Sequence, residues 1–261
     1  MKTALISMNQ LWEDKTGNLE LCGEHIRNAS SAGADLVIFP EMTLTGFTMN
    51  TALSAEDEDS SLTVDAFKGL AVKNCMDIIF GCVFKAGKKA VNAMVYVDSS
   101  GAVQGIYKKI HPFSYAGEDK FFSGGDELVS VKRGGLRLGF AVCYDLRFPE
   151  LFTAQNKEND VIVVIANWPA SRITHWNALL TARAIENQIQ IAGVNRTGTD
   201  GKGLEYVESS KLIHPYGSEC EPLLTSGEMK LYDINPAETA ENREKFRFLQ
   251  DRKPDCYREI I

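Results

Sequence analysis

The chain has 261 residues, of which 44% are hydrophobic and 24% are charged, and its formal net charge is −7. This composition excludes an intrinsically disordered chain, and the length suits one large α/β domain or two ordinary ones. The acidic balance, with no Lys/Arg cluster longer than two residues, argues against nucleic acids and anionic membranes as partners.

The cysteines and the N-terminus narrow the class of protein further. Six cysteines are scattered through the chain without a C-x-x-C pair or a Cys/His spacing suited to zinc, so we expect reduced thiols and no metal site. The N-terminus has an apolar stretch of only five residues, and nowhere do 18 apolar residues run together. We therefore expect a cytoplasmic protein that does not enter a membrane.

The N-terminal half is predicted to alternate strands and helices. Residues 36–39 form an unbroken apolar run, as expected for a strand that is covered on both faces, and Pro40 and Glu41 follow it. The AGKKA sequence at 86–90 is typical of a hairpin turn between two strands. The remaining periodicities predict strands at 3–8, 78–84, 91–97 and 103–107 and helices at 16–33 and from Ser60 onward.

The central region contains a loop with the composition of a functional segment, followed by a strand that ends in a cysteine. Residues 108–127 are too polar and glycine-rich for one regular element and too aromatic for a plain linker. Residues 136–142 alternate apolar side chains with smaller or polar ones, which predicts a strand that ends at Cys143. Polar residues and Pro149 follow at once, so we expect a sharp turn that exposes the sulfur beside backbone N–H groups.

The C-terminal half repeats this order. The run VIVVIANWP, from Val161, is the clearest buried strand, and its likeness to the segment that ends at Glu41 hints at two equivalent halves. The remaining patterns predict a helix at 176–188, strands at 189–194, 207–213 and 228–234, and a helix from Pro236 to about Leu249. Fully apolar strands with helices and hairpins between them imply mixed sheets covered by helices, and with no linker we predict a single domain over 1–261.

Cys143 needs a base before it can act as a nucleophile, because the thiolate is the reactive form. Most strand cysteines are simply buried in the core, so position alone is weak evidence for catalysis. Among the histidines, His111 and His175 lie in loops and remain possible bases. Glu41 is the alternative, since strand ends of an α/β sheet converge at one edge, and Lys109 could lower the thiol pKa and stabilise an oxyanion.

The surroundings of these residues resemble the nitrilase (carbon–nitrogen hydrolase) superfamily. The resemblance lies in LVIFPEMTLTGF, YKKIHPF and CYDLRFPE, and it continues through ANWPASRITHWNALLTARAIENQ, VNRTGTDG and REKFRFLQDRKPDCY over nearly the whole chain. It implies the nitrilase fold, a four-layer α-β-β-α sandwich with two mixed sheets. It also implies a homodimer and an enzyme that needs no metal or organic cofactor.

The same resemblance implies a mechanism. Glu41 acts as the base, Cys143 attacks the amide carbonyl, and water later cleaves the thioester. Lys109 and the backbone N–H of Tyr144 hold the oxyanion. Glu118 orients Lys109 or assists as a second carboxylate, whereas without the resemblance it reads equally well as a solvated loop acid.

The branch of the family that the chain resembles is that of omega-amidase-like enzymes, which act on short omega-amides of 2-oxo dicarboxylic acids. Departures from the pattern are HPF in place of HLF, Glu208 in place of a glycine and His214 in place of an aspartate. These differences bear on the substrate preference and on the conformation of one loop, and not on the reaction class. An N-carbamoyl amidohydrolase, a nitrilase or a deaminated-glutathione amidase with the same triad, or a non-catalytic binding protein of this fold, are the alternatives.

Trp168 and Arg172, which follow the strand that begins at Val161, are candidates for binding a small amide substrate. Trp168 could form a wall of the pocket, and Arg172 could pair with a substrate carboxylate. The alternative is that Trp168 belongs to the core and that Arg172 is a structural ion-pair partner.

Overall fold

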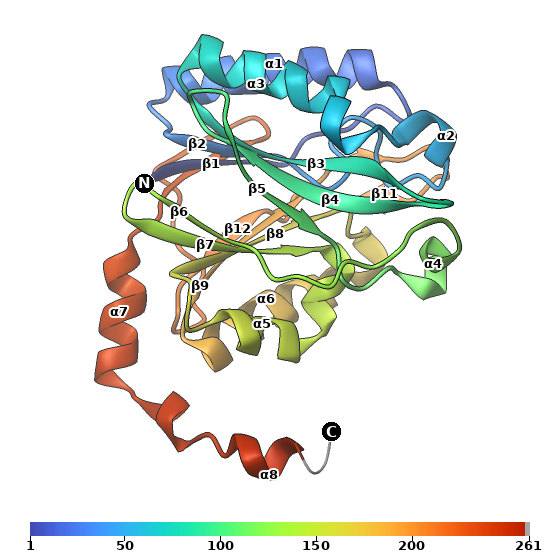
Figure 1. Cartoon of the computed structure of the whole chain (residues 1–261). Helices are drawn as coiled ribbons and strands as arrows, with labels where there is room; N and C mark the ends of the chain where they lie inside the picture. The colour runs from blue at the N-terminus through green and yellow to red at the C-terminus, as the bar shows by residue number, and fades with distance from the viewer. Residues whose placement is uncertain (259–261) are drawn as a thin grey trace.

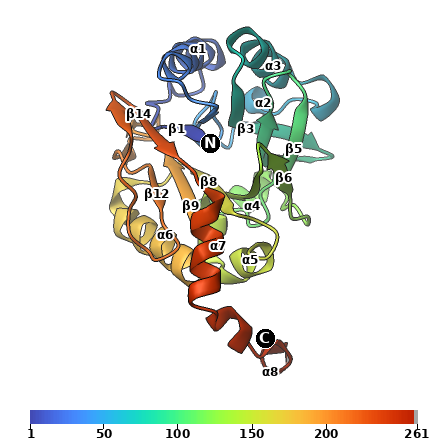
Figure 2. The ribbon, with the colours of Figure 1, turned by 90° about the vertical axis from the view of Figure 1, so that its left-hand side faces the viewer.

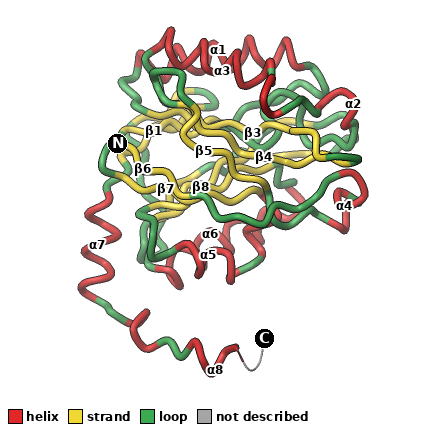
Figure 3. Tube along the Cα trace, viewed as in Figure 1, coloured by secondary structure: helices red, strands yellow, loops and turns green. Residues whose placement is uncertain are grey.

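The computed structural model of the protein describes residues 1–258, and within them two mixed β-sheets pack face to face with helices on both outer faces (Figure 1). Figure 3, coloured by secondary structure, shows the helices above and below the strand layers. This arrangement confirms the four-layer α-β-β-α sandwich.

The first sheet has seven strands among the described residues, in the order β13-β14-β1-β2-β3-β4-β5. Its central strands β1, β2 and β3 are parallel, and the flanking pairs are antiparallel. The hairpin predicted at 86–90 is confirmed, because it joins β3 to β4. The strands are β1 (Lys2–Ile6), β2 (Leu36–Ile38), β3 (Asp77–Ala86), β4 (Lys89–Val97), β5 (Val103–Lys108), β13 (Leu224–Ser226) and β14 (Met229–Asp233).

The second sheet has five strands in the same part of the chain, in the order β12-β9-β8-β7-β6. Here β7, β8 and β9 are parallel, so each sheet has a parallel centre. The strands are β6 (Ser130–Arg133), β7 (Leu136–Val142), β8 (Val161–Ala166), β9 (Gln190–Asn195) and β12 (Lys211–Ile213), and a separate two-stranded ribbon is formed by β10 (Gly198–Thr199) and β11 (Glu205–Tyr206).

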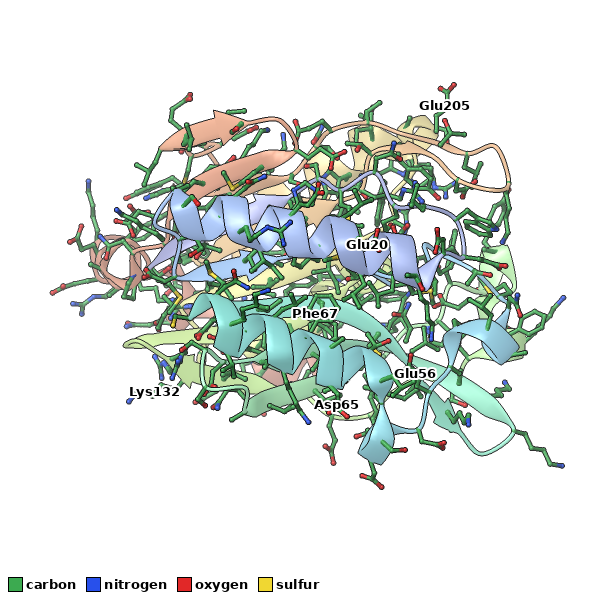
Figure 4. All side chains as sticks on the ribbon, turned by 90° about the horizontal axis from the view of Figure 1, so that it is seen from above. Glu20, Glu56, Asp65, Phe67, Lys132 and Glu205 are labelled. Carbon is green, nitrogen blue, oxygen red and sulfur yellow. The ribbon has the colours of Figure 1, made fainter. Side chains whose placement is uncertain are left out.

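Helices α1 (Lys15–Ser31) and α3 (Leu62–Asn74) cover the first sheet and lie side by side over it (Figure 4). Side-chain oxygens cap both helices, since Asp14 accepts a hydrogen bond from the Gly17 N–H and Ser61 from the Val64 N–H. Helices α5 (Pro149–Gln155) and α6 (Ile173–Asn187) cover the second sheet. The short helices are α2 (Thr51–Ser54), α4 (Glu118–Phe121), α7 (Pro236–Lys245) and α8 (Pro254–Arg258).

The continuous apolar strands are buried on both faces, as their sequences predict. In β8, Val161, Val163 and Ile165 face the other sheet, whereas Ile162 and Val164 pack against the layer of α5 and α6. Alternate residues of one strand thus fill two cores, which explains why no polar residue interrupts the run.

Some predicted boundaries are wrong. The predicted strand 207–213 is reduced to β12, because Glu208 accepts hydrogen bonds from the Ser210 backbone N–H and the Ser7 hydroxyl in place of a strand ladder. The predicted C-terminal helix ends at Lys245, and a separate 3₁₀ turn follows at Phe248–Asp251. In a view turned by 90°, α7 lies between α6 and α5 against the body of the molecule, to which Thr239 and Asn242 hydrogen-bond, and the chain beyond α7 extends away towards α8 (Figure 2). No helix within residues 1–258 is long and apolar enough to span a membrane.

Candidate active site

Ends of strands from both sheets bring the predicted site residues together. Glu41 follows β2, Lys109 directly follows β5, and Cys143 directly follows β7. Glu41 and Lys109 are almost completely buried, at 0% and 1% exposure, although charged side chains rarely are. The cost of burying these charges is offset only if they are paired, so their partners define the site.

Lys109 lies between two buried carboxylates. Its Nζ atom is 3.1 Å from Glu41 Oε1 and 2.8 Å from Glu118 Oε2. Glu118 also accepts a hydrogen bond from the Phe113 backbone N–H, which ties the loop after Lys109 to the cluster. Glu118 is therefore a buried partner of the lysine and not the solvated loop acid that was the alternative interpretation.

Two buried asparagines fix the orientation of the Glu41 carboxylate. Asn92 Nδ2, from β4, donates to Glu41 Oε1 at 2.7 Å and to Glu118 Oε1 at 3.1 Å. The Asn167 backbone N–H donates to Glu41 Oε2 at 2.9 Å, and Asn167 Nδ2 donates to the Glu41 backbone carbonyl at 2.6 Å. Both carboxylate oxygens of Glu41 thus have defined donors.

The backbone after Glu41 is held in an uncommon conformation. Met42 has a φ of 44°, and a Cβ atom placed on Gly81 of β3 would lie 2.2 Å from the Met42 nitrogen. Only glycine at position 81 allows this close approach. Gln10 Nε2 donates to the backbone carbonyls of Glu41 and Met42, so the loop is fixed from the other side as well.

Cys143 begins the 3₁₀ turn Cys143–Arg147 with a φ of 49°, which is strained for a residue other than glycine. The buried Asp145 holds this turn. It accepts hydrogen bonds from the Val142 N–H and the Tyr107 hydroxyl, and on its other oxygen from the His111 N–H. The sharp turn predicted from the sequence is confirmed, and Asp145 connects it to the segment that carries Lys109.

The ionisation of Cys143 depends on the buried cluster. Burial raises the pKa of the Cys143 thiol well above its usual value, and the negative charge of Glu41 raises it further, against the opposite effect of Lys109. Burial alone would lower the pKa of Lys109, but Glu118 and Glu41 outweigh it and raise that pKa. These effects favour the neutral form of the thiol and the charged form of the ammonium group.

The two histidines that remained as possible bases have other partners. His111 Nδ1 lies 2.8 Å from Asp145 Oδ1, and its ring stacks on Phe148. His175 Nδ1 lies 3.4 Å from an Arg147 nitrogen. Within residues 1–258, neither histidine forms a hydrogen bond with Cys143, and no three side chains of His, Cys, Asp or Glu are grouped so that they could hold a metal ion.

Cys143 opens into a pocket of about 320 Å³. Trp168 and Arg172 both line it, as does Tyr144. Trp168 is 3% exposed and its Nε1 donates to the Arg172 carbonyl, so it belongs both to the pocket wall and to the core beneath. The Arg172 guanidinium lies 5.5 Å from the centre of the Phe113 ring.

The sequence interpretation missed Asn92, Asn167 and Gln10. Asn167 directly follows the buried strand β8, so its position at a strand end was a signal that could have singled it out. Asn92 and Gln10 gave no such signal, because one lies within an apolar strand and the other within a polar loop.

The chain is similar to several known proteins. The carbon-nitrogen hydrolase family model matches residues 2–241. The chain is 35% identical over 256 residues to omega-amidase YafV of Escherichia coli K12, covering 96% of each protein. It is 31% identical over 229 residues to 2-oxoglutaramate amidase of Bacillus subtilis 168, covering 87% of this chain and 88% of the relative.

Solved structures show the same fold. XC1258 from Xanthomonas campestris, described as a CN-hydrolase superfamily protein with an arsenic adduct in the active site, is 30% identical with a TM-score of 0.88, and 97% of each chain is covered. A mutant amidase of Nesterenkonia sp. AN1, with the acetamide moiety of fluoroacetamide added covalently at its active-site cysteine, is 25% identical with a TM-score of 0.86, covering 100% of this chain and 97% of that one. This chain is a member of the carbon-nitrogen hydrolase family.

Proposed function

We propose that the protein is a cysteine-dependent amidase that hydrolyses a short omega-amide of a 2-oxo dicarboxylic acid to the carboxylate and ammonia. The observation that carries the proposal is the buried cluster of Glu41, Lys109 and Glu118 next to Cys143 at the base of a pocket. A binding protein of the same fold would have no need for two buried carboxylates around one lysine, because such a cluster is costly to bury.

In the first half-reaction, Cys143 attacks the amide carbon while Glu41 accepts the thiol proton. The raised pKa of Cys143 fits this role for Glu41, because the thiol stays protonated until the substrate is in place. The carbon–nitrogen bond then breaks, and Glu41 passes the proton to the departing ammonia. The product of this step is a thioester on Cys143.

In the second half-reaction, Glu41 takes a proton from water, which attacks the thioester carbon. The carbon–sulfur bond then breaks, and Glu41 returns the proton to the departing sulfur of Cys143, so the acid product leaves and the thiol is restored. Lys109 Nζ and the Tyr144 backbone N–H stabilise the oxyanion in both steps, and loss of one such donor typically costs about 10²–10³ in rate. Glu118 keeps Lys109 charged and oriented.

The substrate assignment rests on the pocket and on the named relatives. Arg172 binds the substrate carboxylate, and Trp168 forms the apolar wall along the carbon chain. The curated relatives named omega-amidase and 2-oxoglutaramate amidase support an acidic amide.

We further propose that the chain acts as one catalytic domain over residues 1–261, in the cytoplasm, as a homodimer. The family match over residues 2–241 supports a single domain. The exposure of Ile185 on α6 (45%) and of Phe246 beyond α7 (59%) supports association of two copies, because both are large apolar side chains.

The test is ammonia release from a panel of 2-oxo omega-amides, glutamine, N-carbamoyl amino acids and nitriles, with Cys143→Ala as the inactive control. We expect turnover of the 2-oxo omega-amides and its loss in the variant. Turnover of nitriles or N-carbamoyl compounds alone would assign the protein to another activity of the family. Arg172→Ala should mainly raise KM for the acidic amides.

A further inference from the structure

The charges that line the active-site pocket are unbalanced. Three cationic side chains line it, namely Arg147, Arg172 and Lys202, and the lining contains one carboxylate, that of Asp200. Within residues 1–258, none of the three cations has a carboxylate within 4 Å. The chain as a whole is acidic, with a net charge of −7, so this excess of positive charge is local.

The carboxylate of Asp200 is occupied by its own turn. One oxygen accepts hydrogen bonds from the backbone N–H groups of Lys202 and Leu204, at 2.8 and 3.0 Å. The other accepts a hydrogen bond from the Tyr206 hydroxyl at 2.9 Å. The fully buried Arg196 lies next to this turn, with its guanidinium 4.7 Å from the centre of the Tyr206 ring.

The two arginines lie on one wall of the pocket. Arg147 stacks 4.8 Å from the Trp168 ring and Arg172 stacks 5.5 Å from the Phe113 ring. Both also line a depression of about 390 Å³, all of whose lining residues belong to the pocket as well. One Arg147 nitrogen lies 3.4 Å from His175 Nδ1, and each guanidinium keeps further N–H groups that can donate to a substrate carboxylate.

Lys202 comes from a different wall, formed by the turn between β10 and β11. Its Nζ atom lies 5.6 Å from the centre of the Trp12 ring, and a Cβ atom placed on Gly201 would lie 2.3 Å from that ring. The turn thus packs closely against Trp12. The turn is therefore anchored, and it presents Lys202 at the pocket. Lys202 is solvent-exposed, and a substrate with a single carboxylate, bound by the two arginines, would leave it unused.

We propose that the pocket accepts amides that carry two negatively charged groups, with Arg147 and Arg172 binding one group and Lys202 binding the other. The inference rests on the proposed amidase function, and it extends the accepted substrates from 2-oxo omega-amides, which carry one carboxylate, to amides with a second anionic group. Lys202 is in this view a residue that determines specificity between amides with one and with two anionic groups.

Binding to the Cys143→Ala protein tests the inference separately from catalysis. The ligands are N-succinylglutamine and N-butyrylglutamine, which share the side-chain amide and one carboxylate and differ by a second, terminal carboxylate. At low salt we expect titration calorimetry to show about three- to fivefold tighter binding of N-succinylglutamine, the range of one partly exposed ion pair. The preference should shrink as salt is added.

Variants in the same Cys143→Ala background test whether Lys202 causes the preference for N-succinylglutamine. Lys202→Gln should abolish it, Lys202→Arg should keep it, and Lys132→Gln, which removes an equal charge from β6 opposite Arg137, at the far end of β7 from Cys143, should also keep it. Equal affinity of both ligands in the parent protein, no binding of either, or a preference that survives Lys202→Gln would overturn the inference. If N-succinylglutamine binds more tightly but the wild-type protein releases no ammonia from any amide, the proposed amidase function is wrong. The proposal that the pocket binds two anionic groups is then still supported.

Discussion

Burial and the neighbouring charges of Glu41 and Lys109 together determine the pKa of the Cys143 thiol. The negative charge of Glu41 raises the pKa of the thiol, and Lys109 lowers it. In the mechanism proposed here, Glu41 is at once the group that suppresses the resting thiolate and the base that creates it during the reaction. Each of these two roles can be followed by its own measurement.

Replacing Glu41 with glutamine removes the base and the negative charge together. We expect kcat to fall by about 10²–10⁴ for loss of a general base. The pKa of Cys143 should fall as well, so the thiolate, measured by its ultraviolet absorbance, should appear at lower pH than in the wild type. Glu150→Gln, on the exposed first turn of α5, is the matched control and should change neither. A thiolate that appears at unchanged or higher pH in Glu41→Gln would contradict this electrostatic coupling.

Asn92 donates one amide group to both carboxylates of the cluster, so Asn92→Ala should lower activity without removing a reacting group. Hydrogen bonds to charged groups contribute about 1.5–3 kcal/mol, which corresponds to a fall of about 10- to 100-fold in kcat/KM. Steady-state ammonia release is the measurement. Asn74→Ala, whose side chain only donates to a helix carbonyl, is the control. A change confined to thermal stability would show that Asn92 is structural only.

At the scale of elements, an acidic side chain joins the two helices of the outer layer. Glu56 accepts hydrogen bonds from Lys15 at the start of α1 and from Ser61 and Thr63 at the start of α3 (Figure 4). Burial alone would raise the pKa of Glu56, but these donors outweigh it and lower the pKa to about 2.

Glu56→Gln should destabilise the protein at neutral pH and not at very low pH. A carboxyl with a lowered folded pKa contributes stability that is present above its unfolded pKa of about 4.3 and is lost as pH falls through the folded value near 2. We expect a loss of about 1–3 kcal/mol at pH 7 in urea unfolding, shrinking across that window. Glu58→Gln, which breaks an exposed pair with Lys108, is the control and should cost less than about 1 kcal/mol. A pH-independent loss would refute the assignment.

At the scale of the whole molecule, exposed apolar side chains on the outer helices bear on assembly. Ile185 on α6 is 45% exposed, and Val72 on α3, in the opposite layer, is 53% exposed. If the homodimer pairs through the α6 face, Ile185→Glu should shift the mass measured by light scattering from twice the 28.9 kDa chain towards the single chain. Val72→Glu is the matched control. A single-chain mass for the wild type would exclude the dimer.

The sequence by itself determined the fold class, the family and the strand ends that carry Glu41, Lys109 and Cys143, because apolar periodicity and motifs at strand ends are local properties of the chain. Only the tertiary structure decided which other side chains complete the site. Asn92 looks like an interruption in the apolar strand β4 and becomes a donor only when β4 lies beside the loop after β2. The same holds for Lys202. Its position in the pocket depends on the packing of its turn against Trp12, which lies almost 190 residues earlier in the chain. Contacts between distant segments leave no periodic trace in either segment, so they could not be predicted from sequence pattern alone.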